Sequence, residues 1–444
     1  MFFLPLKRVA TLGWIGLPND FTFTKIFIIL TLFLFVVNIL LNKNTFLLGS
    51  PFKNALNIAI IFYLFASFLS ILNATEPGAG ISILARRLIV IIIYVLIINI
   101  VHDEKTLRIA ALALIIGNIP NLLGGVYELI TQTPIIDNRL LIMPGEYAGK
   151  ENILLGGGEH IRIQSFLLDS DILAYFTILI MGIVLACLFS PNIISSKFGY
   201  LLFGVLFLLH ITIATAASSR AGWLGLFGSL LIFVLFIKTK YKKFLIAGFS
   251  ILVALIFTIL SVVTDTPMLK KLFGSGNDYS VSQRWLDSKV GLNTFRSNPI
   301  LGVGMGNVEV VRHRFFSKAP GLIERKWIPY FSNGYIQILA ESGLLGLLGY
   351  LSIIVIFIKL MMKVILYSSN IGQRIMALGI LSSFMGHLIM LIAYPLHDSE
   401  LVWTLTGLGI ALFNISGKGA NVIPKNSTPS SWMKTIAYPR KKSI

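Results

Sequence analysis

The feature that most restricts the fold of this chain is a series of apolar stretches, each close to the length of a membrane span, that recurs along most of the sequence. An α-helix needs about 20 residues to cross the roughly 30 Å hydrocarbon core of a bilayer. Charged residues make up only 13% of the 444 residues, whereas a soluble domain carries about 25%. A transmembrane β-barrel would show shorter segments of alternating polarity. The sequence therefore predicts an all-α, polytopic integral membrane protein.

The apolar stretches predict about 11 transmembrane helices, or about 12 if the N-terminal residues hide a further span. Lys7, Arg8 and Pro18 make that first segment more typical of an interfacial stretch. The expected spans are residues 24–41, 54–72, 82–101, 107–130, 172–190, 199–217, 221–237, 244–263, 335–358, 372–393 and 400–417.

Basic residues in short connections predict the orientation of these spans, because Lys and Arg favour cytoplasmic loops. One cluster lies at residues 238–243, a second flanks the connection between residues 359 and 374, and a third lies in the tail. Two predicted spans separate each cluster from the next, so all three fall on the cytoplasmic side. The turn at residues 218–220 then lies on the extracytoplasmic side, together with two longer loops.

This topology predicts four parts of the chain. They are the N-terminal transmembrane helices at 1–263 with an outer loop at 131–171, a large extracytoplasmic loop at 264–332, the C-terminal transmembrane helices at 333–417, and a basic cytoplasmic tail at 418–444.

The net charge of +18 does not indicate a nucleic-acid-binding protein, because the Lys and Arg residues lie at the ends of spans and in loops. There they act as topology signals and contact anionic membrane lipid. The loop 264–332 is basic although it is predicted to lie outside, and loops longer than about 60 residues are translocated largely regardless of charge. Its positive charge predicts an anionic substrate.

Within that loop, residues 280–297 are predicted to form a helix that ends at Asn298 and Pro299. Trp285, Leu292 and Phe295 recur at helical spacing and would lay an apolar face on the membrane surface or on neighbouring spans. Three glycines follow in the sequence GVGMG at 302–306. They lack the strand-to-helix setting of a dinucleotide loop, so a tight turn is the better interpretation.

Glu341 lies inside the predicted span 335–358. A charge within a bilayer costs several kcal/mol unless it is paired or faces a wet cavity, which makes Glu341 a candidate catalytic residue. The alternative is a hydrogen bond between two helices. Gly343, Gly346 and Gly349 follow it and would form a small-residue face for helix packing.

Four segments carry a combination of motifs. Residues 162–176 read RIQSFLLDSDILAYF, residues 217–225 read ASSRAGWLG, residues 282–307 read SQRWLDSKVGLNTFRSNPILGVGMGN, and residues 332–346 read SNGYIQILAESGLLG. With these four segments in this order, the chain resembles the O-antigen ligase and polymerase superfamily (the Wzy-type proteins). That family's pattern runs from an Arg followed by a Trp, through Asn-Pro-x-x-Gly-x-Gly, to His-Asn and a helix with Glu-x-Gly-x-x-Gly.

The resemblance implies a GT-C-like, metal-independent glycosyltransferase without a cofactor, in the bacterial cytoplasmic (inner) membrane. Such an enzyme takes a glycan from undecaprenyl diphosphate on the periplasmic, extracytoplasmic face during surface-polysaccharide biosynthesis. A ligase passes the glycan to the lipid A core of lipopolysaccharide, and a polymerase passes it to another lipid-linked repeat unit.

The expected catalytic pair is Arg220 and Arg284, with Arg162 as a third, substrate-binding arginine. Fixed guanidinium groups can stabilise the negative charge that develops on a diphosphate leaving group without a metal. The alternative for each arginine is ordinary anchoring to lipid headgroups.

Ser332 departs from the family pattern, because the family carries a histidine there that would activate the acceptor. A serine hydroxyl is a poor general base at neutral pH. His313, Glu341, Asp169 and Asp171 are the other candidate bases. His313 also fits a solvated loop residue, and Asp169 and Asp171 also fit residues that end a loop and cap the next span. The departure favours a polymerase over a ligase.

Further residues are expected near the substrate. Ser332 and Asn333 would contact it, and Trp285 and Tyr335 would stack on sugar rings, although aromatic residues are common at membrane interfaces in any case. No His, Asp or Glu cluster has metal-ligand spacing.

Other polar residues near or within the spans have less specific interpretations. His210 and His387 are predicted to be satisfied residues of the helix core. Arg86 and Arg87 are predicted to anchor the third span at the headgroups, with contact to the lipid diphosphate as the alternative. His397 and Asp398 fall in the last outer turn, within reach of the site.

A transporter of a small anion such as bicarbonate is the alternative function, since proteins of similar sequence have been proposed to do this and a basic outer loop can funnel an anion. Such a transporter is expected to show an internal repeat with polar groups near the bilayer midplane. The sequence has no convincing repeat and its polar residues gather toward one face, which favours the enzyme.

Overall fold

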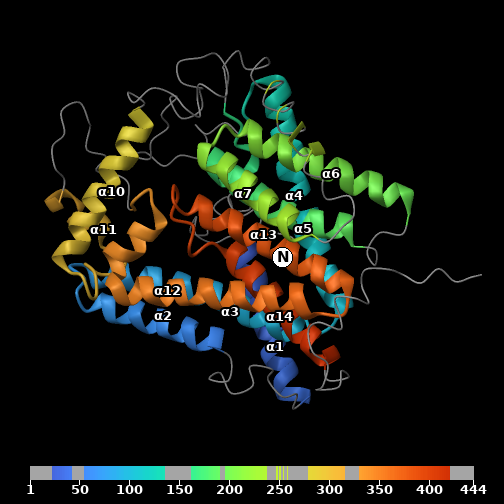
Figure 1. The fold of residues 1–444 in the computed structure, drawn as a ribbon. Helices are drawn as coiled ribbons and strands as arrows, with labels where there is room; N and C mark the ends of the chain where they lie inside the picture. Colours follow the sequence, from blue (N-terminus) through green and yellow to red (C-terminus); the bar gives the residue numbers. More distant parts are fainter. Residues whose placement is uncertain are drawn as a thin grey trace, which may run out of the picture.

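The computed structural model describes residues 23–42, 55–135, 162–190, 196–237, 279–315 and 330–420, with a few positions between 247 and 258. All regular structure in these ranges is helical, which confirms the predicted all-α class (Figure 1). The helices are α1 (Phe23–Asn42), α2 (Ala55–Ile71), α3 (Pro77–Ile100), α4 (Glu104–Thr131), η5 (Ser165–Leu167), α5 (Ser170–Phe189), α6 (Lys197–Ala216), α7 (Arg220–Phe236), α10 (Tyr279–Ser297), α11 (Val308–Val311), η6 (Arg312–Phe315), α12 (Gly334–Tyr367), α13 (Ile371–Met390) and α14 (Glu400–Ala420).

Among the described helices, seven are long and apolar enough to cross a membrane, namely α3, α4, α5, α6, α12, α13 and α14. Three shorter apolar helices lie in α1, α2 and α7. Together these ten helices correspond to ten of the predicted spans. The protein is therefore a polytopic membrane protein, as expected. The predicted span 244–263 lies almost wholly outside the described residues, as do the N-terminal segment, most of the tail and much of the two long loops.

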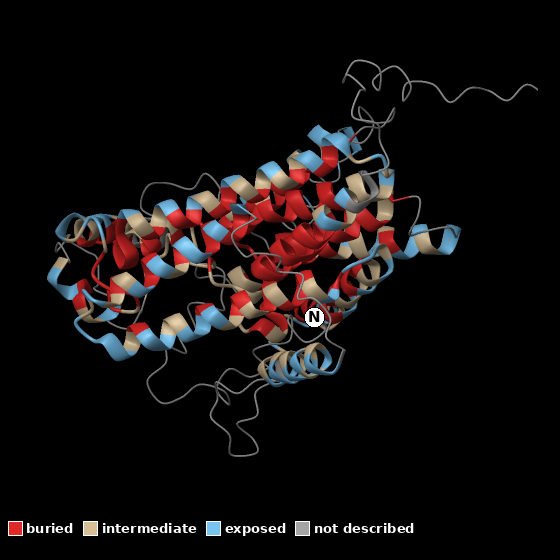
Figure 2. Ribbon diagram, turned by 90° about the horizontal axis from the view of Figure 1, so that it is seen from below, coloured by how far each residue is buried: buried red, intermediate tan, exposed pale blue. Residues whose placement is uncertain are grey.

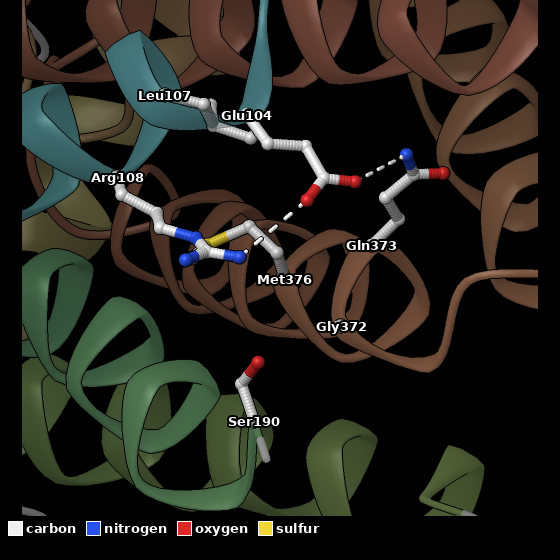
Figure 3. A pocket seen from close by; sticks show the side chains of 7 residues that line it. All are labelled: Glu104, Leu107, Arg108, Ser190, Gly372, Gln373 and Met376. Atoms are coloured by element: carbon white, nitrogen blue, oxygen red, sulfur yellow. Dashed lines mark hydrogen bonds and ion pairs between the residues drawn. The ribbon is translucent and has the colours of Figure 1, made fainter. Parts of the chain in front are cut away.

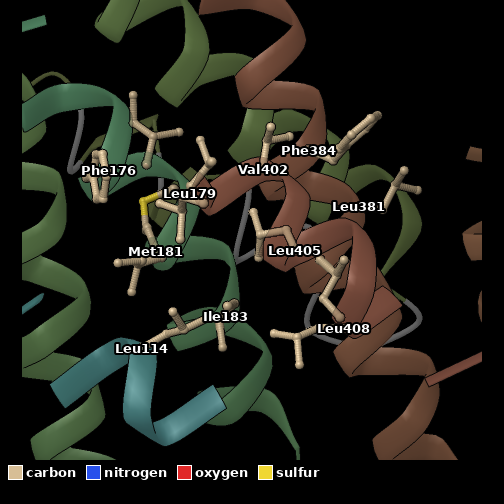
Figure 4. Packing of buried hydrophobic residues seen from close by; sticks show 14 of the residues in the cluster. Leu114, Phe176, Leu179, Met181, Ile183, Leu381, Phe384, Val402, Leu405 and Leu408 are labelled. Atoms are coloured by element: carbon tan, nitrogen blue, oxygen red, sulfur yellow. The ribbon is translucent and has the colours of Figure 1, made fainter. Parts of the chain in front are cut away.

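Helix α5 forms the centre of the core, and almost all of its residues are buried. Buried side chains of α4, α13 and α14 pack around it (Figure 4). Small residues allow the closest approach, since a Cβ atom added to Gly182 of α5 would lie 2.5 Å from the carbonyl oxygen of Gly379 in α13. The outward faces of the helices remain apolar and exposed, as expected for a lipid-facing surface (Figure 2).

Helix α12 is broken at Gly343, where φ is 63°. The backbone N–H groups of Leu344 and Leu345 donate to the carbonyl oxygens of Pro299 (2.9 Å) and Ile300 (3.4 Å). A Cβ atom at Gly343 would lie 2.2 Å from the oxygen of Ile300. The predicted helix-packing role holds at Gly349, where a Cβ atom would lie 2.9 Å from Cα of Tyr63 in α2, whereas Gly343 sits at a helix break that another segment fills.

The segment that fills the break is residues 298–306, which we call the glycine turn. The N–H groups of Val303 and Gly304 donate to the carbonyl oxygens of Ala340 (2.9 Å) and Glu341 (3.1 Å) in α12. These contacts satisfy backbone groups that the break would leave unpaired.

The three glycines of this turn all have positive φ, at 72° for Gly302, 100° for Gly304 and 71° for Gly306. Only glycine adopts this region readily, and each one also lies against a neighbouring backbone. The predicted tight turn is confirmed.

Two asparagines fix the glycine turn to the connection between α2 and α3. Asn73 Nδ2 donates to the carbonyl oxygen of Gly302 (3.1 Å), and Asn307 Oδ1 accepts from the N–H of Glu76 (2.7 Å). Helices α2, α3 and α12 are thereby held together at the end of the bundle where α10 lies (Figure 1).

Candidate functional site

Two arginines from distant parts of the chain converge on one carboxylate. Nη2 of Arg162 lies 3.6 Å from Oδ1 of Asp171, and Nη2 of Arg284 lies 3.5 Å from Oδ2 of the same residue. The side chains of the two arginines are 23% and 38% exposed, so they are partly open to ligands. The structure thus brings together one member of the predicted catalytic pair and the third predicted arginine.

The local fold holds Asp171 in the first turn of α5. Asp169 is the N-cap of that helix, and its Oδ1 accepts from the N–H groups of Asp171 (2.8 Å) and Ile172 (3.1 Å). The prediction that Asp169 and Asp171 serve as bases is not tested by this arrangement. It does show that Asp169 is already engaged as a helix cap.

A buried carboxylate on α4 holds the segment that follows Arg162. Oε2 of Glu128 accepts from the backbone N–H groups of Gln164 and Ser165, each at 2.7 Å, and Oε1 accepts from Ile135 at 3.0 Å. These bonds fix the segment that follows Arg162 against the last turn of α4. Sequence reasoning missed Glu128, although an acidic residue inside the predicted span 107–130 was a signal that could have identified it.

A second carboxylate, Asp287, lies one helical turn after Arg284 on α10. Ser332 Oγ donates to its Oδ2 at 2.9 Å, and Nη2 of Arg312 pairs with its Oδ1. Asp287 and Arg312 are both 3% exposed, whereas Ser332 is half-buried. Ser332 therefore joins a buried ion pair to a more accessible surface.

Two tyrosines connect these groups. Arg312 Nη1 donates to the carbonyl oxygen of Tyr330 at 3.4 Å, the rings of Tyr330 and Tyr394 lie 5.9 Å apart, and the hydroxyl of Tyr394 donates to Asp169 Oδ2 at 3.1 Å. Together with the stretch of α10 that joins Arg284 to Asp287, these contacts form a closed circuit, which we call the polar ring. Its members are Arg162, Asp169, Asp171, Arg284, Asp287, Arg312, Tyr330, Ser332 and Tyr394.

Arg220 begins α7 at the same end of the bundle. Ser219 caps this helix through a 3.0 Å bond from the N–H of Gly222 to its Oγ. A Cβ atom at Gly222 would lie 2.8 Å from Ala174, which is one turn beyond Asp171 in α5. The half-buried Arg220 thus lies at the start of a helix that packs beside the polar ring, and its catalytic role stays a prediction.

The remaining predicted site residues lie outside the polar ring. His313 is exposed on η6, and the Trp285 side chain is 60% exposed with Nζ of Lys289 3.6 Å from its ring centroid. Leu292 is exposed as well, and α10 packs through Leu286 and Val290 instead. The apolar stripe predicted for α10 is thus the face turned away from α12.

Asn333 and Tyr335 have clear structural partners. Asn333 caps α12, with its Oδ1 accepting from the N–H of Tyr335 (2.9 Å) and of Ile336 (3.1 Å). The hydroxyl of Tyr335 donates to the carbonyl oxygen of Leu388 at 3.0 Å. Contacts of these residues with substrate stay predictions.

Glu341 has a defined partner in the glycine turn. Its Oε1 accepts a 2.9 Å hydrogen bond from the N–H of Gly306, and its side chain is buried. The observed bond joins two segments of backbone, close to the alternative of a helix-bridging hydrogen bond. A catalytic role for Glu341 stays a prediction.

Arg87 is buried at 1% exposure, so the expectation of headgroup anchoring is wrong for this residue. Its Nε lies 3.0 Å from both carboxylate oxygens of Asp398, and its Nη2 lies 2.8 Å from Oδ2. Its Nη1 donates to Ser67 Oγ, and the guanidinium lies 4.3 Å from the ring centroid of Tyr63. This cluster ties α3 to α2 and to the turn before α14.

His397 and Asp398 belong to this Arg87 cluster rather than to the polar ring. Burial lowers the pKa of His397 to about 4, and the Arg87 charge acts in the same direction against the attraction of Asp398. Burial alone would raise the pKa of Asp398, but Arg87 holds it below its ordinary value. The pair is therefore a neutral imidazole beside a carboxylate at neutral pH.

The two predicted core histidines are confirmed. His387 lies between the hydroxyls of Tyr175 (3.2 Å) and Tyr350 (3.1 Å). His210 contacts the carbonyl oxygen of Leu206 at 2.7 Å through Nδ1.

A pocket lies at the other end of the bundle, where α4 and α13 begin (Figure 3). Glu104 Oε1 accepts there from Asn370 Nδ2 (2.7 Å) and Gln373 Nε2 (2.9 Å). These bonds tie two helix N-termini together, and the pocket has no connection with the polar ring. Among the described residues, no group of three or more His, Cys, Asp or Glu side chains could hold a metal ion.

The O-antigen ligase family model matches residues 203–351. The matched stretch runs from α6 into α12 and includes Arg220, Arg284 and Ser332. No curated protein matches the chain significantly. The match covers the motif segments at 217–225, 282–307 and 332–346, whereas the segment 162–176, which contains Arg162, lies outside it.

Proposed function

With an O-antigen ligase domain at residues 203–351, this chain is a membrane protein of the O-antigen ligase and polymerase superfamily, and we propose that it is a lipid-linked oligosaccharide glycosyltransferase. The donor is a glycan carried on undecaprenyl diphosphate, and the acceptor is a sugar hydroxyl of a second glycan. Ser332 in place of the family histidine favours a lipid-linked repeat unit as acceptor, and hence a polymerase.

The observation that carries this proposal is the convergence of Arg162 and Arg284 on Asp171. The two guanidinium groups come from separate segments and flank one anionic group without making a tight bond to it. A phosphate placed between them would gain charge-assisted hydrogen bonds from both sides. When the glycosidic bond to the diphosphate breaks, the leaving group gains negative charge, and fixed cations stabilise that charge without a metal.

The polar ring lies at the end of the bundle that the positive-inside rule assigns to the extracytoplasmic face. We place the reaction there, in the cytoplasmic membrane, with the large loop 264–332 and the helices at 333–417 as the parts that hold donor and acceptor. Arg220 lies beside the ring, and we assign it to the diphosphate as well. Asn333, Tyr335 and Trp285 remain proposed contacts for the glycan.

The test uses purified protein in nanodiscs with undecaprenyl-diphosphate glycan and no added divalent metal. Longer lipid-linked glycans from donor alone indicate a polymerase, and transfer that requires added lipid A core indicates a ligase. Replacing Arg284 or Arg162 by Ala should reduce turnover at least about 100-fold, the scale seen when one stabilising donor is removed. Arg296→Ala is the matched control, because Arg296 is an exposed cation on the same helix. Normal turnover in both arginine variants, or complete loss of wild-type activity in chelator, would refute this mechanism.

A further inference from the structure

Glycosyl transfer to a hydroxyl requires a group that removes the acceptor proton, and this inference rests on the proposed function. Three described carboxylates near the site are committed elsewhere. Asp169 caps α5 and accepts from Tyr394, Asp171 lies between the two arginines assigned to the leaving group, and Glu341 is bonded to the glycine turn. His313 is exposed outside the polar ring.

Asp287 and Ser332 are arranged differently. The Ser332 hydroxyl donates to Asp287 Oδ2 at 2.9 Å, so the lone pairs of Oγ point away from the carboxylate and are able to accept a proton. Asp287 is buried, whereas Ser332 is half-buried, and only the serine is placed to meet a substrate. Arg312 pairs with the other carboxylate oxygen and fixes the orientation of the carboxylate.

The position of this pair matches the geometry that the reaction needs. Asp287 follows Arg284 by three residues on α10, and side chains at that spacing lie on the same helix face, about 5–6 Å apart at Cβ. A donor diphosphate held by Arg284 would therefore have its sugar within about one helical turn of Ser332. Arg284, which binds the leaving group, and Asp287, which acts on the attacking hydroxyl through Ser332, would therefore lie on the same face of α10.

We infer that Ser332 and Asp287 form a two-step proton relay that deprotonates the acceptor sugar hydroxyl. The acceptor oxygen forms a bond to the anomeric carbon of the donor, and the bond from that carbon to the diphosphate oxygen breaks, with its electron pair staying on the diphosphate. The acceptor proton moves to Ser332 Oγ while the serine's own proton moves to Asp287 Oδ2. Asp287 returns its proton to water by the same route after the products leave.

A weak base is sufficient for this step. Glycosyl transfer passes through an oxocarbenium-like transition state, in which the acceptor hydroxyl becomes acidic as its oxygen bonds to the cationic carbon. Ser332 is the catalytic residue of the relay, since it touches the acceptor, and Asp287 acts through it.

The decisive experiment compares Ser332→Ala with Ser332→Thr in the nanodisc assay. Removing the hydroxyl should lower kcat at least about 100-fold, the lower limit of general-base contributions, with the donor KM unchanged. Ser332→Thr keeps a hydroxyl and should retain kcat within about ten-fold, a drop below the range that the loss of general-base catalysis produces. Asp287→Asn should lower kcat like Ser332→Ala, and the solvent deuterium isotope effect on kcat should shrink in both variants.

Two results would overturn the relay while leaving the proposed function intact. One is wild-type turnover in Ser332→Ala. The other is a loss in Asp287→Asn that appears in donor affinity and melting temperature but not in kcat, as expected of a structural brace. If Asp287→Asn does not fold, the serine pair alone decides the question. If the wild-type protein itself transfers no glycan from the lipid diphosphate, the proposed function fails instead.

Discussion

The carboxylate of Glu341 accepts a 2.9 Å hydrogen bond from the backbone N–H of Gly306, across the break in α12. The two residues lie 35 positions apart in the sequence, in the glycine turn and in α12. Their contact fixes the glycine turn inside a helix that would otherwise be continuous. This hydrogen bond gives the buried carboxyl group of Glu341 a structural role that does not depend on catalysis.

Glu341→Ala should destabilise the protein by about 1–3 kcal/mol, the cost of leaving a buried N–H group without its acceptor. Glu341→Gln keeps an acceptor oxygen and should cost less. Thermal unfolding in detergent measures the difference, with Glu309→Ala as a control at an exposed carboxylate three residues beyond Gly306. Equal melting temperatures for Glu341→Ala and the control would contradict the structural role of this bond.

Gly343→Ala should be among the most damaging small substitutions in the chain. Its φ of 63° disfavours any residue with a Cβ atom, and the added atom would lie 2.2 Å from the oxygen of Ile300. We expect loss of folded protein, measured by size-exclusion yield from the membrane fraction. Gly204→Ala in α6 is the matched control, since nothing lies within 4 Å of a Cβ atom there. Normal yield of the Gly343 variant would show that the helix break is not required.

Glu128 is predicted to position Arg162 without touching substrate. Glu128→Ala removes the acceptor of two 2.7 Å bonds from Gln164 and Ser165, which frees the segment next to Arg162. Donor affinity should fall by about as much as in Arg162→Ala, and combining the two substitutions should add little, because residues that act through one contact are not additive. Binding of undecaprenyl diphosphate to nanodiscs tests this, with Tyr127→Phe as a neighbouring control. Fully additive losses would mean that Glu128 acts elsewhere.

Acid should destabilise the Arg87 cluster through His397. Its pKa is about 4 in the folded protein, below the ordinary value of about 6.5, so the unfolded chain binds more protons between these limits. The free energy of unfolding should therefore fall as pH is lowered from 6.5 to 4, by at most about 1.4 kcal/mol per pH unit for this group. The pKa of Asp398 is lowered below its ordinary value, so its contribution is present above about pH 3.9 and is lost at lower pH.

The measurement is the melting temperature at pH 7 and pH 5 for the wild type and for His397→Gln. The variant should lose less stability over this range than the wild type does. The difference between the two proteins is the informative quantity, because it isolates the contribution of His397. An identical pH dependence in both proteins would show that His397 is not held neutral.

The predicted spans follow from the lipid environment and depend little on how the helices pack against one another. A run of apolar residues of bilayer length forms a helix in lipid because every backbone group must be satisfied within the segment. This is why ten predicted spans correspond to described helices. The same locality applies to α10, whose end at Ser297 before Asn298 and Pro299 could be predicted because proline restricts the residue that precedes it.

The site depends on a different kind of information. The motifs identified Arg162, Arg284 and Ser332 as residues of interest, but nothing in their spacing says that Arg162 and Arg284 share Asp171, or that Ser332 meets Asp287. These contacts join segments far apart in the chain, so they cannot be predicted from the pattern of neighbouring residues. The Arg87 cluster was misplaced for the same reason, whereas Glu128 was missed although its position inside a predicted span was a local signal.

By itself, the sequence determined the membrane-spanning helices and the tight glycine turn, because each follows from the chemistry of neighbouring residues. Only the tertiary structure decided which charged groups meet, where α12 breaks and which arginine is buried. The physical reason is that lipid fixes helix formation one segment at a time, whereas the pairing of polar side chains in the interior depends on how all the segments pack together.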